Sequence, residues 1–415
     1  MPLNPKRTVN ELKELRQLTG DSNGAQRVAW TDTWLKAREW LQTKLSGLPV
    51  EQHYDAAGNN WITLPGNSPE ALLLGGHLDS VPNGGWLDGS LGVLASLEVL
   101  RRFIEEFNGR PPVTIKLVDW ADEEGARFGR SLFGSSAFAG THSIDADRVR
   151  TDKDGVRLEA ALERCGVDID RLDEAGKERE NASAYLELHI EQGPVLEGMG
   201  LPLAAVLGTK GVERHAVTFF GQEAHSGSTP MDVRRDALAA AAKLALEIRP
   251  IAARQKDAVC TMGSVKTYPG IVTAIVGRCE TTLDQRDLDP VVLARMHGEA
   301  IEASERFARE EGCTAEWSRI WNIEPVPFHP ELIQLCQEAI REIAVEAPCL
   351  PSGPLHDAAE VSRAGIPTVM MFVQSLGGIS HNKIEDTKEE YIELSVVAFD
   401  GLANKAIAWI DGRGE

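Results

Sequence analysis

The sequence predicts an α/β fold in which a smaller α+β module is inserted into a larger domain of sheet and helices. In the first part of the chain, an amphipathic helix pattern at 91–107 lies between two short apolar strands, which is typical of a sheet with helix crossovers. The pattern changes around 208–211, after which predicted strands outnumber predicted helices. A segment with three prolines, 322–330, is followed by a strongly apolar strand at 368–373. This strand has the same pattern as the short apolar strands of the first part of the chain. We therefore expect one domain that is interrupted by another.

The predicted boundaries divide the chain into three segments. The larger domain comprises 1–210 and 327–415, and the inserted module comprises 211–326. At 415 residues the chain is long enough for each domain to bury a core of its own. We find no internal repeat and no low-complexity segment in the sequence.

The first segment alternates between helical and extended patterns. Helices are predicted at 11–19, 34–46 and 91–107, and strands at 61–64, 71–74, 113–118 and 185–190. One face of the second helix carries Trp34, Leu35, Trp40, Leu41 and Leu45. The charged stretch 145–181 favours helix on the surface.

The inserted module has the pattern of two helices on one antiparallel sheet. Its predicted order is strand 214–220, helix 231–248, strands 258–266, 271–276 and 279–286, helix 290–312 and strand 313–320. The last segment adds a helix at 331–345, a loop at 351–357 and the strand at 368–373. Together these elements predict a compact α+β module between two parts of an α/β domain.

Composition narrows the class of protein and of partner. The fractions of hydrophobic and charged residues, 42% and 26%, are ordinary for a globular protein. No apolar run reaches the length of a membrane span, and the first residues lack the apolar core of a signal peptide. The net charge of −20, from 43 basic and 63 acidic residues, disfavours nucleic acid and anionic membrane as partners. The six cysteines are scattered without a CxxC motif and are expected to be reduced thiols of a cytoplasmic protein.

Polar side chains follow several of the predicted apolar strands. They are His77, Asp79, Asp88, Glu123, Glu124, His189 and His381. Any one of them alone is more often an ordinary loop group, and the glycine-rich stretch 75–90 alone could be a polar turn. Because strand ends along one edge of an α/β sheet form binding crevices, their joint placement predicts a shared site.

The types of side chain in this set indicate a metal site. Imidazole and carboxylate ligands without thiolate suit Zn²⁺, Mn²⁺, Co²⁺ or Ni²⁺. Three histidines and several carboxylates exceed what one tetrahedral ion needs. A pair of ions about 3.5–4 Å apart, bridged by a carboxylate, would use them all.

The two adjacent glutamates are expected to have different roles. Neighbouring side chains in an extended segment or a turn diverge, so Glu123 and Glu124 cannot easily chelate one ion together. We expect one to bind metal and the other to take a proton from water. Asp79 lies two residues after His77 and is expected to accept the far imidazole N–H, which would fix the tautomer.

Several long motifs resemble one known family. They are GGHLDSVPNGGWLDGSLGV, DEEGARFG, LHIEQGPVLE, AHSGSTPM, the strand end Asp284-Gln285-Arg286, and GGISHNKIEDT. These motifs resemble the metallopeptidase-like amidohydrolases of the M20 group over nearly the whole chain. The resemblance is nearest to the branch of N-carbamoyl-L-amino acid hydrolases, β-ureidopropionases and allantoate amidohydrolases. It implies a catalytic domain with two divalent ions per subunit (Zn, Mn, Co or Ni) and an inserted domain that forms a homodimer and acts as a lid.

The resemblance also implies a role for each predicted ligand. His77 and His189 would bind one ion, and Glu124 and His381 would bind the second. Asp88 would bridge both ions. Glu123 would be the general base that activates water and then passes the proton to the leaving nitrogen.

Three further residues match substrate-binding positions of the family. His225 in the inserted module would stabilise the tetrahedral oxyanion, Arg286 would clamp the substrate carboxylate, and Gln192 would lie near the scissile amide. Without the resemblance, His225 would be interpreted as a loop histidine and Arg286 as an exposed strand-end charge. His356 and Asp357 also match the family and are expected to support the ligands from behind.

Two departures from the family pattern concern the substrate. Thr273 stands where an asparagine commonly helps to hold the substrate carboxylate. Pro354 and Leu355 stand before His356 where Ala-Gly is usual, and a leucine side chain would fill the space that glycine leaves open. Both changes leave the predicted metal ligands intact, so hydrolysis is better supported than the identity of the substrate.

We therefore predict a metal-dependent hydrolase that cleaves a linear C–N amide bond in a small carboxylate substrate, foremost an N-carbamoyl-L-amino acid. Alternative substrates are another N-acyl amino acid, allantoate, ureidoglycolate or a dipeptide. An alternative from a different class is a binding protein that keeps the fold without catalysis.

Overall fold

The computed structural model describes residues 2–413, which form two structural units. Unit 1 contains 2–207 and 328–413, and unit 2 is the intervening segment Gly208–Pro327. The predicted insertion, 211–326, falls within unit 2. The α/β class predicted from the sequence is confirmed, because unit 1 combines a mixed sheet with helices on both faces.

The sheet of unit 1 has parallel strands in its middle and antiparallel strands toward its edges. The central strands, in spatial order, are β17 (Thr368–Val373), β7 (Ala182–Ile190), β5 (Ser68–His77) and β6 (Val113–Trp120). Antiparallel β8 (Leu203–Thr209) lies beside β17, and β4 (Asn60–Leu64) and β3 (Glu51–Tyr54) continue the sheet beyond β6. Two short strands, β15 (Val326–Pro327) and β16 (Cys349–Ser352), pair with β8. The parallel strands therefore end along one edge of the sheet.

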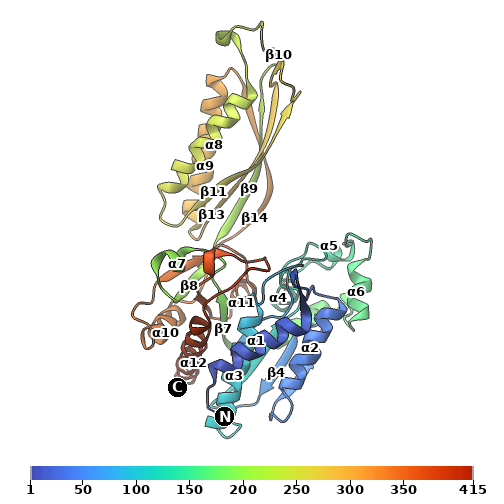
Figure 1. Cartoon of the computed structure of the whole chain (residues 1–415), viewed down its shortest axis with the longest axis vertical. Helices are drawn as coiled ribbons and strands as arrows, with labels where there is room; N and C mark the ends of the chain where they lie inside the picture. Colours follow the sequence, from blue (N-terminus) through green and yellow to red (C-terminus); the bar gives the residue numbers. More distant parts are fainter. Residues whose placement is uncertain (1, 414–415) are drawn as a thin grey trace. The chain divides into compact units, whose positions relative to one another are not determined.

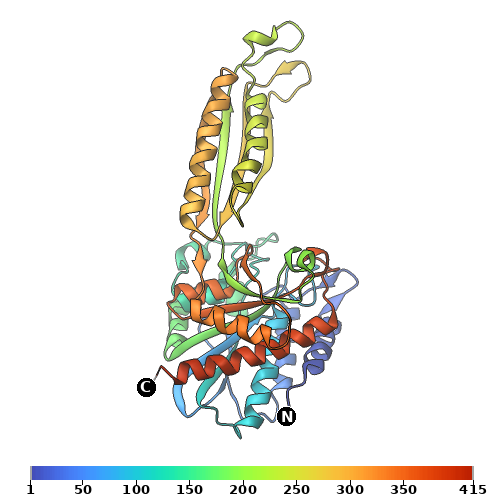
Figure 2. The same ribbon diagram turned by 90° about the vertical axis from the view of Figure 1, so that its left-hand side faces the viewer.

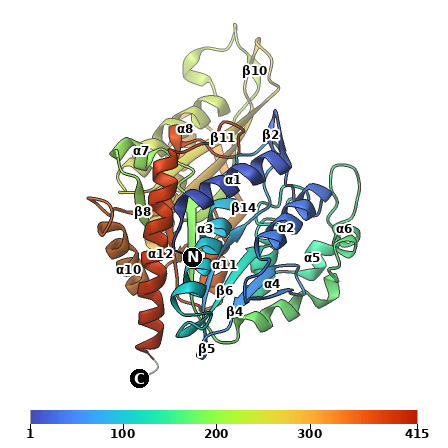
Figure 3. The same ribbon diagram turned by 60° about the horizontal axis from the view of Figure 1, so that its bottom comes forward.

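Side chains of the central strands alternate between two hydrophobic cores. Leu72 and Leu74 enter the core on one face, whereas Leu73 enters the core on the other. The first core is completed by α1 (Pro5–Thr19), α2 (Asp32–Lys44), α3 (Ser90–Glu106), α10 (Pro330–Arg341) and α12 (Glu389–Asp411). The second is completed by α4 (Phe133–Ala139) and α11 (Asp357–Arg363). Because helices cover both faces, the strands are continuously apolar, and Figure 3 shows α1, α3 and α12 side by side on one face.

Unit 2 is a four-stranded antiparallel sheet with two helices on one face. The strand order is β11 (Val259–Tyr268), β13 (Arg278–Asp287), β9 (Gly211–Phe220) and β14 (Thr314–Ile323). The helices α8 (Ala237–Ala253) and α9 (Pro290–Glu310) lie side by side against this sheet (Figures 1 and 2). Leu244 of α8 and Met296 of α9 are buried with Phe219 in the core between the layers.

Two predictions within unit 2 are wrong. The helix expected at 231–248 starts only at Ala237, because the Asp236 side chain accepts hydrogen bonds from the Leu238 and Ala239 amides and so caps the helix there. The strand expected at 271–276 is reduced to β12 (Ala274–Ile275), which pairs with β10 (Ala224–His225) and not with the main sheet. Residue Gly270 has a φ of 67°, so the chain turns before this segment can extend β11.

The remaining elements are short. The charged stretch 145–181 begins within α5 (Ile144–Arg148) and contains α6 (Leu158–Arg164) and a 3₁₀ helix (Ile169–Arg179). Elsewhere, α7 (Val195–Met199) follows β7, and β1 (Gly20–Asp21) pairs with β2 (Gly24–Ala25). Among the helices within residues 2–413, none combines the length and apolarity that crossing a membrane requires.

Candidate metal centre and active site

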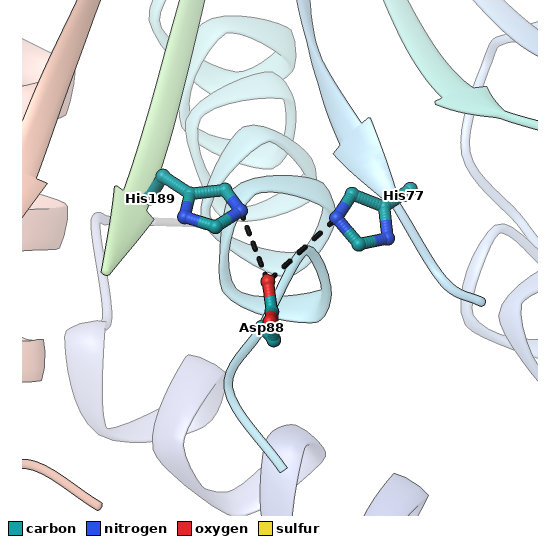
Figure 4. A group of neighbouring side chains, drawn as sticks. All are labelled: His77, Asp88 and His189. Atoms are coloured by element: carbon teal, nitrogen blue, oxygen red, sulfur yellow. Dashed lines mark ion pairs between the residues drawn. The ribbon is translucent and has the colours of Figure 1, made fainter. Parts of the chain in front are cut away.

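The first group of candidate ligands lies at the carboxyl ends of β5 and β7. His77 is the last residue of β5, His189 is the penultimate residue of β7, and Asp88 belongs to the loop that leads from β5 to α3. The Asp88 Oδ1 atom lies 3.1 Å from His189 Nε2 and 3.8 Å from His77 Nε2 (Figure 4). All three side chains are buried. Two strand ends and one loop thus converge on a single carboxylate oxygen.

The second group uses the other oxygen of the same carboxylate. Asp88 Oδ2 lies 3.3 Å from His381 Nε2, and that nitrogen also lies 3.3 Å from Glu124 Oε2. Glu124 follows β6, and His381 lies in the loop after β17. The five predicted metal ligands therefore form two neighbouring groups that share Asp88.

The geometry of these groups fits divalent ions. A tetrahedral Zn²⁺ ion with bonds of about 2.0–2.1 Å holds its ligand atoms about 3.3–3.4 Å apart, and the separations above span 3.1 to 3.8 Å. The Nε2 atoms of His77 and His189 are buried and have no hydrogen-bond partner. Such buried polar atoms without partners are rare, and a cation beside them would use both lone pairs.

Charge in the second group favours the same interpretation. Burial and the charge of Asp88 raise the pKa of Glu124 to about 7. The Asp88 side chain raises the pKa of His381 to about 9. Although burial opposes it, His189 and His381 hold the pKa of Asp88 well below its usual range. The group thus retains protons near neutral pH, and a divalent cation would displace them.

Backbone carbonyl groups fix the orientation of two imidazole rings. His77 Nδ1 lies 3.1 Å from the carbonyl oxygen of Asp79, and His189 Nδ1 lies 2.9 Å from that of Ile190. Each Nδ1 therefore donates to a carbonyl oxygen, so Nε2 is the ring nitrogen that faces Asp88 and would bind a metal ion.

The Asp79 side chain was expected to accept the far imidazole N–H of His77. Its Oδ1 atom lies 3.5 Å from His77 Nδ1, and the Asp79 carbonyl oxygen, at 3.1 Å, is the nearer acceptor. The two carboxylate oxygens accept hydrogen bonds from the amides of Glu123 and Glu124, at 3.2 and 3.1 Å. Asp79 therefore ties the segment after β6 to the end of β5.

A buried glutamate that the sequence analysis did not single out holds the Asp88 loop. Glu385 Oε1 accepts hydrogen bonds from the amides of Leu87 and Asp88, at 3.0 and 3.1 Å. Its Oε2 atom lies 2.8 Å from Ser380 Oγ, which in turn lies 3.0 Å from Asp88 Oδ2. Glu385 belongs to the motif GGISHNKIEDT. That motif could have indicated Glu385 as a site residue, but only its histidine, His381, was predicted to be one.

A buried arginine behind the same loop was also missed. Arg27 is fully buried and donates to the Leu78 carbonyl at 2.8 Å and to Ser90 Oγ at 3.0 Å. Burial lowers the pKa of Arg27 to about 10, although the negative charges of Glu385 and Asp79 act to raise it. Arg27 thus places a cation beneath an acidic site. No sequence pattern links it to that site, because it lies far from the motifs.

The turn that leads from Asp88 into α3 requires glycine at position 89. Gly89 has a φ of 63°, and a Cβ atom there would lie 2.3 Å from the His77 ring. Any side chain at this position would therefore displace the imidazole. The glycine lets the chain pass directly beside the ligand before α3 begins.

The two ligand groups open into a cavity of about 220 Å³. The residues that line it are Asp88, Glu123, Glu124, Ser131, His189, Gln192, Pro354, Leu355, His356 and His381. Glu123 Oε2 lies 3.8 Å from His77 Nε2, and burial, aided by Asp357 and Glu124, raises the pKa of Glu123 well above its usual range. Gln192 Nε2 donates to Asp88 Oδ2 at 2.9 Å. Glu123, the predicted general base, and Gln192, which was predicted to lie near the scissile amide, therefore line the same cavity.

The remaining predicted residues belong to unit 2. His225 is exposed in β10, and its Nδ1 accepts a hydrogen bond from the Gly227 amide at 3.1 Å. Arg286 in β13 donates through Nε to Asp284 Oδ1 at 2.8 Å, and Asp284 also pairs with Arg214 at 2.6 Å. The carbonyl of Thr273 accepts from the Ser226 amide, beside His225.

Comparisons with known proteins confirm the resemblance found in the sequence. A model of peptidase family M20/M25/M40 matches residues 73–405. The chain is 37% identical over 375 residues to N-carbamoyl-L-amino acid amidohydrolase from Geobacillus stearothermophilus, with coverage of 89% of this chain and 90% of the relative. It is 32% identical over 385 residues to allantoate amidohydrolase from Bacillus subtilis, with 92% of each covered. A crystal structure of an amidase of the hydantoinase/carbamoylase family from Burkholderia multivorans matches with a TM-score of 0.88 at 31% identity, covering 98% of both chains.

Replacement of Glu385 tests how the Asp88 loop is held. In Glu385→Ala the amides of Leu87 and Asp88 lose their acceptor, and affinity for Zn²⁺ or Mn²⁺ is expected to fall about 10- to 100-fold. Glu385→Gln keeps an acceptor oxygen and is expected to lose less. Isothermal titration calorimetry measures both, with Glu390→Ala on the exposed start of α12 as the control. Unchanged affinity in Glu385→Ala would show that the loop holds Asp88 without this contact.

Proposed function

This chain belongs to peptidase family M20/M25/M40, and we propose that it hydrolyses the linear amide bond of an N-carbamoyl-L-amino acid with two divalent ions per subunit. The observation that carries this proposal is the shared cavity, in which the buried carboxylate of Glu123 lies beside members of both candidate ligand groups. The name of the Geobacillus stearothermophilus relative supports the choice of substrate.

Five side chains would hold the two ions. His77 and His189 would bind one ion, Glu124 and His381 the other, and Asp88 both. Their nitrogen and oxygen donors suit Zn²⁺, Mn²⁺, Co²⁺ or Ni²⁺. When bound, such ions polarise a carbonyl oxygen and lower the pKa of water.

Glu123 would move the proton. Its carboxylate would accept a proton from the attacking water and then give it to the leaving nitrogen as the C–N bond breaks. The raised pKa of Glu123, caused first by burial, makes its carboxylate a stronger base than an exposed glutamate. Gln192, held at 2.9 Å from Asp88, would orient the amide.

Unit 2 would contribute two groups to the substrate. Because His225 Nδ1 accepts a hydrogen bond, the ring proton is on Nε2, and that N–H is a donor suited to an oxyanion. Arg286 and Arg214 both contact the carboxylate of Asp284. The planar guanidinium of Arg286 has the geometry to bind a substrate carboxylate in a fork. We further propose a homodimer formed through unit 2, as the sequence resemblance implies.

Allantoate is the second candidate substrate. The relative from Bacillus subtilis is an allantoate amidohydrolase, and it is similar to this chain over 92% of its length. Allantoate carries the same carboxylate and the same type of C–N bond, so it would use the same groups. A panel of N-carbamoyl-L-amino acids, allantoate and dipeptides, assayed with each of the four metals, separates these activities.

Replacement of Glu123 tests the catalytic proposal. Glu123→Gln removes the proton acceptor while it keeps the shape, so kcat is expected to fall about 10²- to 10⁴-fold. The content of bound metal, measured by mass spectrometry, is expected to stay at the wild-type value. Glu39→Gln, an exposed carboxylate on α2, is the control. Near-normal turnover in metal-loaded Glu123→Gln would refute the role of Glu123, and inactivity of the wild type on every ureido substrate would refute the proposed function.

Replacement of Arg286 tests the binding of the substrate carboxylate. Loss of charge-assisted hydrogen bonds in Arg286→Met is expected to lower kcat/KM about 10- to 100-fold, mainly through KM. Arg278→Met is the matched control, because Arg278 lies at the other end of β13 and packs on Tyr268. Equal effects of the two variants would contradict a specific role for Arg286.

A further inference from the structure

The cavity of the candidate site has one apolar wall. Eight of its ten lining residues are polar or charged, and the exceptions are Pro354 and Leu355. These two are neighbours in the loop between β16 and α11, and both are partly buried. A bound molecule would therefore meet hydrogen-bonding groups on most sides and hydrocarbon on one.

Hydrogen bonds hold this wall in place. Ser352 Oγ donates to the Pro354 carbonyl at 2.9 Å. Since its proton is used there, Ser352 Oγ accepts from His356 Nε2, also at 2.9 Å. The His356 ring packs against the His189 ring, with centroids 4.5 Å apart. Internal hydrogen bonds thus hold the turn 352–356, and its His356 packs against the candidate metal ligand His189. The position of Leu355 in the cavity wall is therefore constrained.

We propose that Leu355 determines the specificity of this site by contacting an apolar side chain of the substrate. This inference rests on the proposed function and names the class of substrate within it: N-carbamoyl-L-amino acids with aliphatic side chains. One methylene in a hydrophobic pocket changes kcat/KM by about 10- to 200-fold. Contact with Leu355 is therefore sufficient to give different kcat/KM values to substrates that differ only in their side chain.

The same wall disfavours allantoate. Allantoate has a second ureido group where an amino acid has its side chain. Placed against Leu355, that group would leave N–H and C=O groups without partners, because neither Leu355 nor Pro354 offers a polar side chain. A substrate whose polar groups lose their hydrogen-bond partners in the site can have a much lower kcat/KM than one whose groups are all paired. In this chain Leu355 would therefore favour N-carbamoyl amino acids with apolar side chains over allantoate.

Two replacements separate the size of the wall from its polarity. Leu355→Ala shortens the side chain, and Leu355→Asn keeps a similar size but adds an amide. The measurement is kcat/KM of the metal-loaded enzymes for N-carbamoyl-L-leucine, N-carbamoylglycine and allantoate. Leu376→Ala is the control, because Leu376 is a partly buried leucine of the loop after β17 and does not line the cavity. Thermal unfolding of each variant reports whether it is folded.

The ratio of kcat/KM for the leucine substrate to that for the glycine substrate is expected to fall about 10-fold in Leu355→Ala. The ratio of allantoate to the leucine substrate is expected to rise at least as much in Leu355→Asn. If both ratios stay at the wild-type values in folded variants, the specificity role of Leu355 is refuted while the proposed function stands. If the wild type hydrolyses none of the three substrates, the proposed function fails, and this inference fails with it.

Discussion

The carboxylate of Asp88 is the constraint on which the rest of the site depends. Its two oxygens face different ligand groups, with Oδ1 at 3.1 Å from His189 and Oδ2 at 3.3 Å from His381. For one side chain to serve both groups, the loop after β5 has to fold back over the strand ends. Gly89 makes that path possible, because its φ of 63° and its lack of a Cβ let the chain pass beside the His77 ring.

A buried acidic site is costly unless its charges are compensated. The fold compensates in part with Arg27, which is fully buried beneath the loop and hydrogen-bonded to the Leu78 carbonyl. Hydrogen bonds from backbone amides do the same for Asp79 and Glu385. Protons on Glu124 and His381, whose pKa values are raised to about 7 and about 9, reflect the negative charge that remains. Divalent cations would complete the balance, so the same groups that stabilise the fold prepare the site for metal.

The sequence predicted the ligands better than the groups that hold them. His77, Asp88, Glu124, His189 and His381 were found because each follows an apolar strand and lies in a long motif. Arg27 acts through hydrogen bonds across large sequence separations, which leave no periodic pattern. The helix α12 was not predicted, although its buried residues Ile392, Val396 and Phe399 recur at helical spacing. The expected strand at 271–276 failed because apolar residues such as Val272, which is 97% exposed, belong to a surface loop.

The number of metal ions held per subunit tests the central role of Asp88 most directly. Elemental analysis by mass spectrometry, combined with anomalous diffraction from crystals of the metal-loaded protein, counts and places the ions. The shared carboxylate predicts two ions in the wild type and weakened binding of both in Asp88→Ala. Two ions bound with unchanged affinity in Asp88→Ala, or a single ion in the saturated wild type, would contradict a centre organised around Asp88.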